Sequence, residues 1–121
     1  RVCATTKSDS LAAIVKYGAI PVAAPYWTDC LVLLQQDDVA AISTDDSILA
    51  GLAAQDPWTK ILRPAISPQP YGLAISNKHR DFVQFVNAVL EQLRTDGQWA
   101  ASYARWIGHP VPAPPPALYA S

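Results

Sequence analysis

The chain lacks several features on which a catalytic or membrane-spanning protein depends. It has 121 residues with no Met, two Cys, two His and five Gly. No apolar run reaches the roughly 20 residues that a transmembrane helix requires, so the sequence predicts no membrane span. Because Met is absent even at position 1 and no signal peptide is present, we expect a processed or excised piece of a longer protein.

A strong charge of either sign is also absent. Nine Lys and Arg residues balance ten Asp and Glu residues, and this balance predicts no nucleic-acid partner. The G-x-S-x-G, H-E-x-x-H, P-loop and G-x-G-x-x-G motifs are missing. His79 and His109 fall at predicted loop or helix-end positions. We therefore expect a binding protein rather than an enzyme, with no catalytic residue, no metal site and no cofactor.

The cysteines, Cys3 and Cys30, do not form a C-x-x-C pair. They are compatible with a disulfide in an exported protein, and the alternative is two buried free thiols. Composition leaves both interpretations open.

The stretch Val39–Ala54 predicts a strand that runs directly into a capped helix. Val39–Ile42 is a short apolar run, and capping residue types follow it at 43–47 before a helical spacing of apolar residues. In open α/β sheets, ligands bind at the carboxyl ends of strands, where such helices begin. The alternative is a plain cap with two solvated aspartates.

The preceding residues repeat this alternation. Strands are predicted at Val2–Thr6 and Ile20–Ala24, with helices that begin after Ser8 and near Thr28 or Asp29, and a fourth strand is predicted at Lys60–Arg63. This order predicts a three-layer α/β fold, with a mostly parallel sheet and helices on both faces.

After the proline-rich stretch Pro64–Pro70 the pattern changes. Tyr71–Ile75 predicts a fifth strand, and Gly97 separates two helices that together would form a hairpin. Residues 109–121 are rich in proline and predict an extended tail. The first of these helices carries an apolar stripe of Phe82, Phe85, Val86, Val89, Leu90 and Leu93, and the second carries Trp99, Tyr103, Trp106 and Ile107.

Two of the predicted helix N-termini carry residues suited to a zwitterion. Thr5–Ser8 follows the first strand and Thr44–Asp46 follows the third. Helix N-termini favour a carboxylate, and Lys7 adds a cation. Asp45 suits an ammonium group. An N–H or cationic site that faces a carboxylate is what a free amino acid requires.

Four stretches, taken in order, resemble a known family. The stretches are VCATTKSDSL (2–11), WTDCL (27–31), AISTDDSILAG (41–51) and QPYGLAI (69–75). With them the chain resembles the second half of an extracellular solute-binding protein of the polar amino-acid type (family 3), in particular the glutamate/glutamine-binding lipoproteins of actinobacterial ABC importers. The likeness extends from residue 1 to about residue 108.

The resemblance implies the type II periplasmic-binding-protein fold, in which two α/β lobes close on an amino acid. Residues 1–68 would form the second lobe, residues 69–108 would supply a crossover strand and C-terminal helices to the first lobe, and 109–121 would be the tail. It also implies a lipid-anchored, extracytoplasmic protein that binds glutamate, glutamine or aspartate for an ABC permease, in import or nutrient sensing. The alternative is a non-transport sensor or interaction module on the same fold.

The resemblance also assigns roles to single residues. Asp45 matches the acceptor of the ligand's ammonium, Ser8 matches a hydroxyl that donates to its α-carboxylate, and Thr5 falls where some members recognise the side chain. Thr6 and Lys7 line the same turn, and Thr44 precedes the aspartate. The family usually reads Gly-(Ser/Thr)-Thr-Ser where this chain has KSDS at 7–10. Lys7 thus replaces a glycine and favours an acidic ligand side chain.

Three further expectations follow. Cys3 lies in the first strand and Cys30 at the start of a helix that packs on that sheet, so we predict a disulfide between them. The resemblance implies that an arginine in the first lobe usually pairs with the ligand's α-carboxylate. Because this chain lacks the N-terminal part of that lobe, we expect the isolated chain to bind amino acids weakly or not at all. We expect the apolar stripe to cause self-association through the C-terminal helices. The alternatives are that these helices fold back on the 1–68 sheet, or that the second helix covers the stripe.

Overall fold

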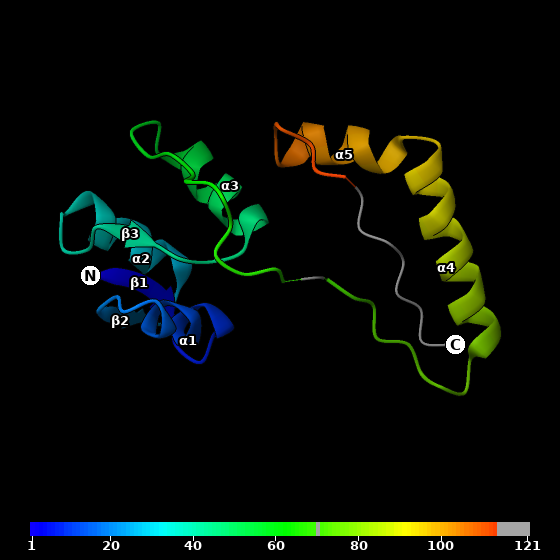
Figure 1. Ribbon diagram of the computed structural model, residues 1–121, viewed down its shortest axis with the longest axis horizontal. Helices are drawn as coiled ribbons and strands as arrows, with labels where there is room; N and C mark the ends of the chain where they lie inside the picture. Colours follow the sequence, from blue (N-terminus) through cyan, green and yellow to red (C-terminus); the bar gives the residue numbers. More distant parts are fainter. Residues whose placement is uncertain (70, 114–121) are drawn as a thin grey trace. The chain divides into compact units, whose positions relative to one another are not determined.

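A computed structural model describes residues 1–69 and 71–113 of the chain. The chain divides into two units, Arg1–Gln69 and Pro70–Ser121, and each is described by itself (Figure 1). Of the predicted proline-rich tail, residues 114–121 lie outside the described residues. The assignment of the two units to lobes of a larger protein stays a prediction.

The first unit contains a parallel three-stranded sheet. Its strands are β1 (Val2–Thr5), β2 (Pro21–Ala24) and β3 (Ala41–Ile42), in the order β2-β1-β3. In β1, Cys3 is level with Val22 on one side and with Ile42 on the other. The predicted parallel α/β arrangement is confirmed for these three strands.

Three helices alternate with the strands: α1 (Asp9–Lys16), α2 (Trp27–Gln35) and α3 (Asp46–Gln55). Ser8 caps α1 as predicted, because its Oγ accepts a hydrogen bond of 3.1 Å from the Leu11 N–H. Gly18, with φ of +77°, follows the end of α1. Capping residues therefore set the start and the end of α1.

The core of the first unit is built around a disulfide. Cys3 and Cys30 are fully buried and bonded to each other, which confirms the predicted pair and links α2 to β1. Ala24 and Val39 complete the buried cluster. Successive residues of a strand point to opposite faces, and Cys3 and Ala4 are both fully buried, so β1 is covered on both faces. The full three-layer lobe stays a prediction.

Two predicted strands are wrong. Neither Lys60–Arg63 nor Tyr71–Ile75 forms a strand in the structure. A strand requires a neighbour that accepts and donates ladder hydrogen bonds, and among the described residues the sheet holds only β1, β2 and β3. The residues after α3 are held instead by contacts such as the 2.7 Å hydrogen bond from the Tyr17 hydroxyl to the Ile66 carbonyl.

The second unit contains α4 (Arg80–Thr95) and α5 (Gln98–Trp106), which contact each other. Gly97, with φ of +83°, joins them. Phe82 and Phe85 stack with ring centroids 6.4 Å apart and are 51% and 62% exposed. The predicted helical hairpin is not confirmed, and α5 does not cover this end of the apolar stripe. No helix in the described ranges 1–69 and 71–113 is long and apolar enough to cross a membrane.

Asp56 gives a first test of the fold. Its side chain is buried and accepts hydrogen bonds of 3.0 Å from Gln35 Nε2 and from the Trp58 N–H, joining the end of α2 to the turn after α3. Asp56→Ala leaves both donors without this acceptor, so we expect a loss of about 1–3 kcal/mol in the free energy of unfolding, measured in urea. The exposed control Asp38→Ala should change it by less than about 0.5 kcal/mol. Equal effects of the two variants would contradict the role given to Asp56.

Candidate functional site

The turn after β1 is organised by hydrogen bonds to its own backbone. The Thr6 N–H donates to the Ala24 carbonyl over 2.9 Å. The Ser8 hydroxyl donates to the Thr5 carbonyl over 2.8 Å while its oxygen accepts the Leu11 N–H. Ser8 therefore uses its hydroxyl proton within the turn, and in this structure it is not directed at an α-carboxylate. The first-turn N–H groups of α1 and the Lys7 ammonium are the donors suited to an anion here.

Lys7 has an uncommon backbone conformation. Its φ is +61° and its side chain is exposed. A non-glycine residue in this left-handed region costs about 1–2 kcal/mol relative to the ordinary helical conformation. The position thus has the geometry that glycine adopts most easily, and the chain places a cation there.

The residues after β3 lie beside this turn. The Ser43 N–H donates to the Cys3 carbonyl over 2.9 Å, which extends the β1–β3 pairing beyond the end of β3. Continuing the Cys3–Ile42 register by two residues sets Thr44 level with Thr5. Thr44 and Asp45 are half-buried, and Asp45 is the N-cap residue of α3, although its side chain makes no capping hydrogen bond.

The topology explains why these two segments meet. The chain passes from β1 to β2 on one side and from β2 to β3 on the other, so the direction of winding reverses between β1 and β3. In open parallel sheets, ligands bind outside the carboxyl ends of the strands at such a switch point. The structure therefore brings together both predicted segments, Thr5–Ser8 and Thr44–Asp45, at the carboxyl ends of β1 and β3.

The site at the carboxyl ends of β1 and β3 combines both signs of charge. The N-termini of α1 and α3 carry partial positive charge and Lys7 carries a full one, whereas Asp45 supplies a carboxylate. Such an arrangement suits a ligand that bears a carboxylate and an ammonium group close together. In the part of the chain that the structure describes, no three His, Cys, Asp or Glu side chains are grouped in a way that would hold a metal ion.

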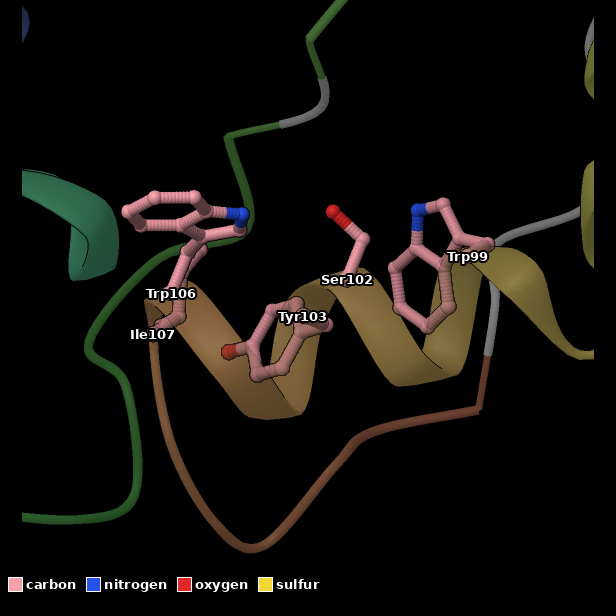
Figure 2. Close-up of a pocket in the computed structure, with 5 residues that line it drawn as sticks. All are labelled: Trp99, Ser102, Tyr103, Trp106 and Ile107. Carbon is pink, nitrogen blue, oxygen red and sulfur yellow. The ribbon is translucent and has the colours of Figure 1, made fainter.

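The structure also shows a pocket that the sequence interpretation missed. A shallow hollow of about 180 Å³ lies on α5, in the second unit (Figure 2), and none of the predicted site residues lines it. The rings of Trp99 and Tyr103 lie 5.4 Å apart, and the Arg105 guanidinium lies 4.9 Å from the Trp106 ring centroid. The helical spacing of the aromatic residues was visible in the sequence. The pocket is lined by Trp99, Ser102, Tyr103, Trp106 and Ile107.

Comparison with curated proteins finds a relative in Bacillus subtilis (strain 168). Over 81 residues the chain is 25% identical to its ABC transporter glutamine-binding protein GlnH. The match covers 67% of this chain and 30% of that protein, so the chain spans only about 30% of its relative's length. No family model matches the chain. No solved structure matches it significantly. The similarity supports the predicted relationship to solute-binding proteins.

Proposed function

We propose that this chain is part of an extracytoplasmic amino-acid-binding protein that serves an ABC importer. The observation that carries the proposal is the meeting of Thr5–Ser8 and Thr44–Asp45 at the switch point between β1 and β3. The similarity to a glutamine-binding protein supports the same ligand class. The chain is proposed to bind and release its ligand, without a catalytic step.

In this proposal each group has one task. Asp45 accepts hydrogen bonds from the ligand's ammonium group, and the first-turn N–H groups of α1 bind its α-carboxylate. Thr5, Thr6 and Thr44 line the floor between the two strand ends. Ser8 fixes the turn through its bonds to Thr5 and Leu11. Lys7 favours an acidic side chain, which places glutamate and aspartate beside glutamine in the proposed ligand class.

The proposed whole protein is larger than this chain. Residues 1–68 form its second lobe, residues 69–108 return to a first lobe, and the first lobe supplies the opposite wall of the site. An ABC permease is the proposed partner, and a lipid anchor is proposed to hold the protein at the cell envelope. The chain covers only 30% of its relative's length, so the complete site and the permease contact are proposed for the whole protein.

Calorimetry on the full 121-residue chain tests whether it supplies one wall of the site. Loss of an opposing charge partner costs about 2–5 kcal/mol, which weakens a micromolar site about 30-fold to several thousand-fold. We therefore expect little or no heat with glutamine, glutamate, aspartate or asparagine at micromolar concentration. Micromolar binding of any of them would show that the chain holds a complete site, against this proposal.

We also propose that the chain self-associates through the apolar stripe of α4, since Phe82 and Phe85 lie exposed on it. Burying one such side chain is worth about 1.5–3 kcal/mol. Phe85→Asp should shift the equilibrium toward monomer in sedimentation equilibrium, whereas Gln84→Asp, which adds the same charge off the stripe, should leave it unchanged. A wild-type chain that is monomeric at high concentration would refute this proposal.

A further inference from the structure

The pocket on α5 is lined by aromatic rings and by hydrogen-bond donors. Trp106 is 73% exposed, and its ring, Trp99 and Tyr103 form an open apolar surface. Figure 2 shows the indole nitrogens of Trp99 and Trp106 and the hydroxyl of Ser102 on the same side of the helix. Within residues 1–69 and 71–113, these three side-chain groups have no hydrogen-bond partner.

This combination fits a proline-rich strand of polypeptide. Proline offers a carbonyl acceptor but no N–H donor, and an indole N–H is a donor only. Proline-rich segments adopt the polyproline II helix before they bind, and they dock on aromatic-lined grooves with little loss of entropy. An aromatic pocket whose unpaired polar groups include two indole donors therefore matches a backbone in which most residues only accept.

The chain carries such a segment directly after α5. Residues 110–116 read PVPAPPP, with five prolines in seven residues. Gly108 has φ of +105°, and its N–H donates to the Tyr103 carbonyl over 3.1 Å. This geometry reverses the chain at the end of α5. Both Figure 1 and Figure 2 show that the described residues after α5 run back alongside the helix.

The length of the segment is sufficient to cover the pocket. The nine residues of α5 extend about 14 Å at 1.5 Å per residue. Seven residues in polyproline II extend about 22 Å. The described residues of the segment do not line the pocket, so a rotation about the Gly108 backbone is needed to bring the prolines over the aromatic face.

We propose that the pocket on α5 is the docking site of the chain's own proline-rich segment, residues 110–116. The tether makes this segment the favoured occupant, because a short linker gives an effective concentration in the millimolar range. Trp99 and Trp106 stack against proline rings, and their indole N–H groups donate to carbonyls of the segment. This contact is independent of the amino-acid site. The docked segment also prevents other proline-rich chains from binding to the pocket.

Indole N–H signals in a ¹H–¹⁵N spectrum test the proposal on the full chain. A variant that ends at Gly108 should shift the signals of Trp99 and Trp106. The signal of Trp58, which is 95% exposed in the first unit, should not move. Pro114→Ser, Pro115→Ser and Pro116→Ser, introduced together, keep the chain length and should produce the same shifts. Unchanged Trp99 and Trp106 signals in both variants would overturn the proposal.

A peptide of residues 109–121 gives the second measurement. It should bind the shortened chain with a dissociation constant at least about threefold lower than for the full chain, because the tethered segment competes. A peptide with alanine in place of every proline is the control and should not bind. Equal binding to both chains, or no binding to either, would count against docking. In Phe85→Asp, which should not associate through α4, Trp99 and Trp106 signals that change on dilution would assign the docked segment to a second copy, and the tethered form would be wrong.

Discussion

Replacing Cys3 and Cys30 together by alanine is expected to lower the free energy of unfolding of the 1–69 unit by about 3–4 kcal/mol. The two residues are separated by 27 positions, and their bond removes conformational freedom from the unfolded chain. Both sulfur atoms are fully buried in the core between β1 and α2, so their removal also leaves a cavity. Urea unfolding followed by circular dichroism measures the change.

The matched control keeps both sulfur atoms. The wild-type chain, reduced in denaturant and refolded in reductant, should lose most of the same stability without the cavity. Because the 1–69 unit contains β1 and the turn at 5–8, we also expect faster amide exchange in β1. Two titratable thiols in the unreduced, denatured chain would show that the bond is absent and would remove the basis of this prediction.

Replacing Asp45 by asparagine is expected to abolish the response of the chain to glutamine. Loss of one partner in a desolvated charge pair costs about 2–5 kcal/mol, which corresponds to about 30-fold to several thousand-fold in affinity. Because the wild-type affinity is expected to be weak already, no response should remain in the variant. Chemical-shift titration is the appropriate measurement, since it detects weak and rapidly exchanging ligands.

Asp46→Asn is the control for this variant. Asp46 is the neighbouring acid, is exposed, and accepts the Ser47 N–H over 2.8 Å, and its replacement removes the same charge from the same helix N-terminus. We expect the glutamine response to survive in Asp46→Asn. An equal loss in both variants would mean that overall charge, and not a specific ammonium acceptor at Asp45, governs binding.

Local signals in the sequence predicted most of the first unit. Ser8 caps α1, and Gly18 follows its last turn, because both act through short-range backbone geometry. The alternation of apolar runs with helices predicted the parallel order of β1, β2 and β3. The disulfide was also predictable, since one cysteine lies in a strand and the other in a helix that packs on that strand.

The errors concern features that depend on distant partners. Lys60–Arg63 and Tyr71–Ile75 have apolar composition, yet a strand exists only when another strand pairs with it. The helical spacing of the aromatic residues on α5 was visible in the sequence, but this spacing does not show what covers a helix face, and the structure leaves a pocket there. Predictions from spacing alone were therefore reliable for local structure. They were unreliable for which strands pair and for what covers an apolar helix face.

The candidate site, too, was predicted from the sequence only in part. The sequence predicted a site at Thr5–Ser8 and Thr44–Asp45, and the strand order places both segments at the carboxyl ends of β1 and β3. It did not show that the Ser8 hydroxyl donates to the Thr5 carbonyl, which competes with a ligand carboxylate for the same hydroxyl proton. Nor did it show the positive φ of Lys7, which side-chain chemistry does not encode.

The carboxyl ends of β1 and β3 are proposed to bind a free amino acid. The most direct test is a ¹H–¹⁵N titration of the full chain with glutamine up to concentrations well above about 1 mM, where a weak site is occupied. We expect saturable shifts confined to the amides of residues 5–11 and 43–47, present in wild type and Asp46→Asn and absent in Asp45→Asn. If the chain is instead part of a sensor or interaction module that binds no ligand, glutamine should cause no shifts. The absence of shifts, or shifts that cluster on α5 instead, would contradict the claim.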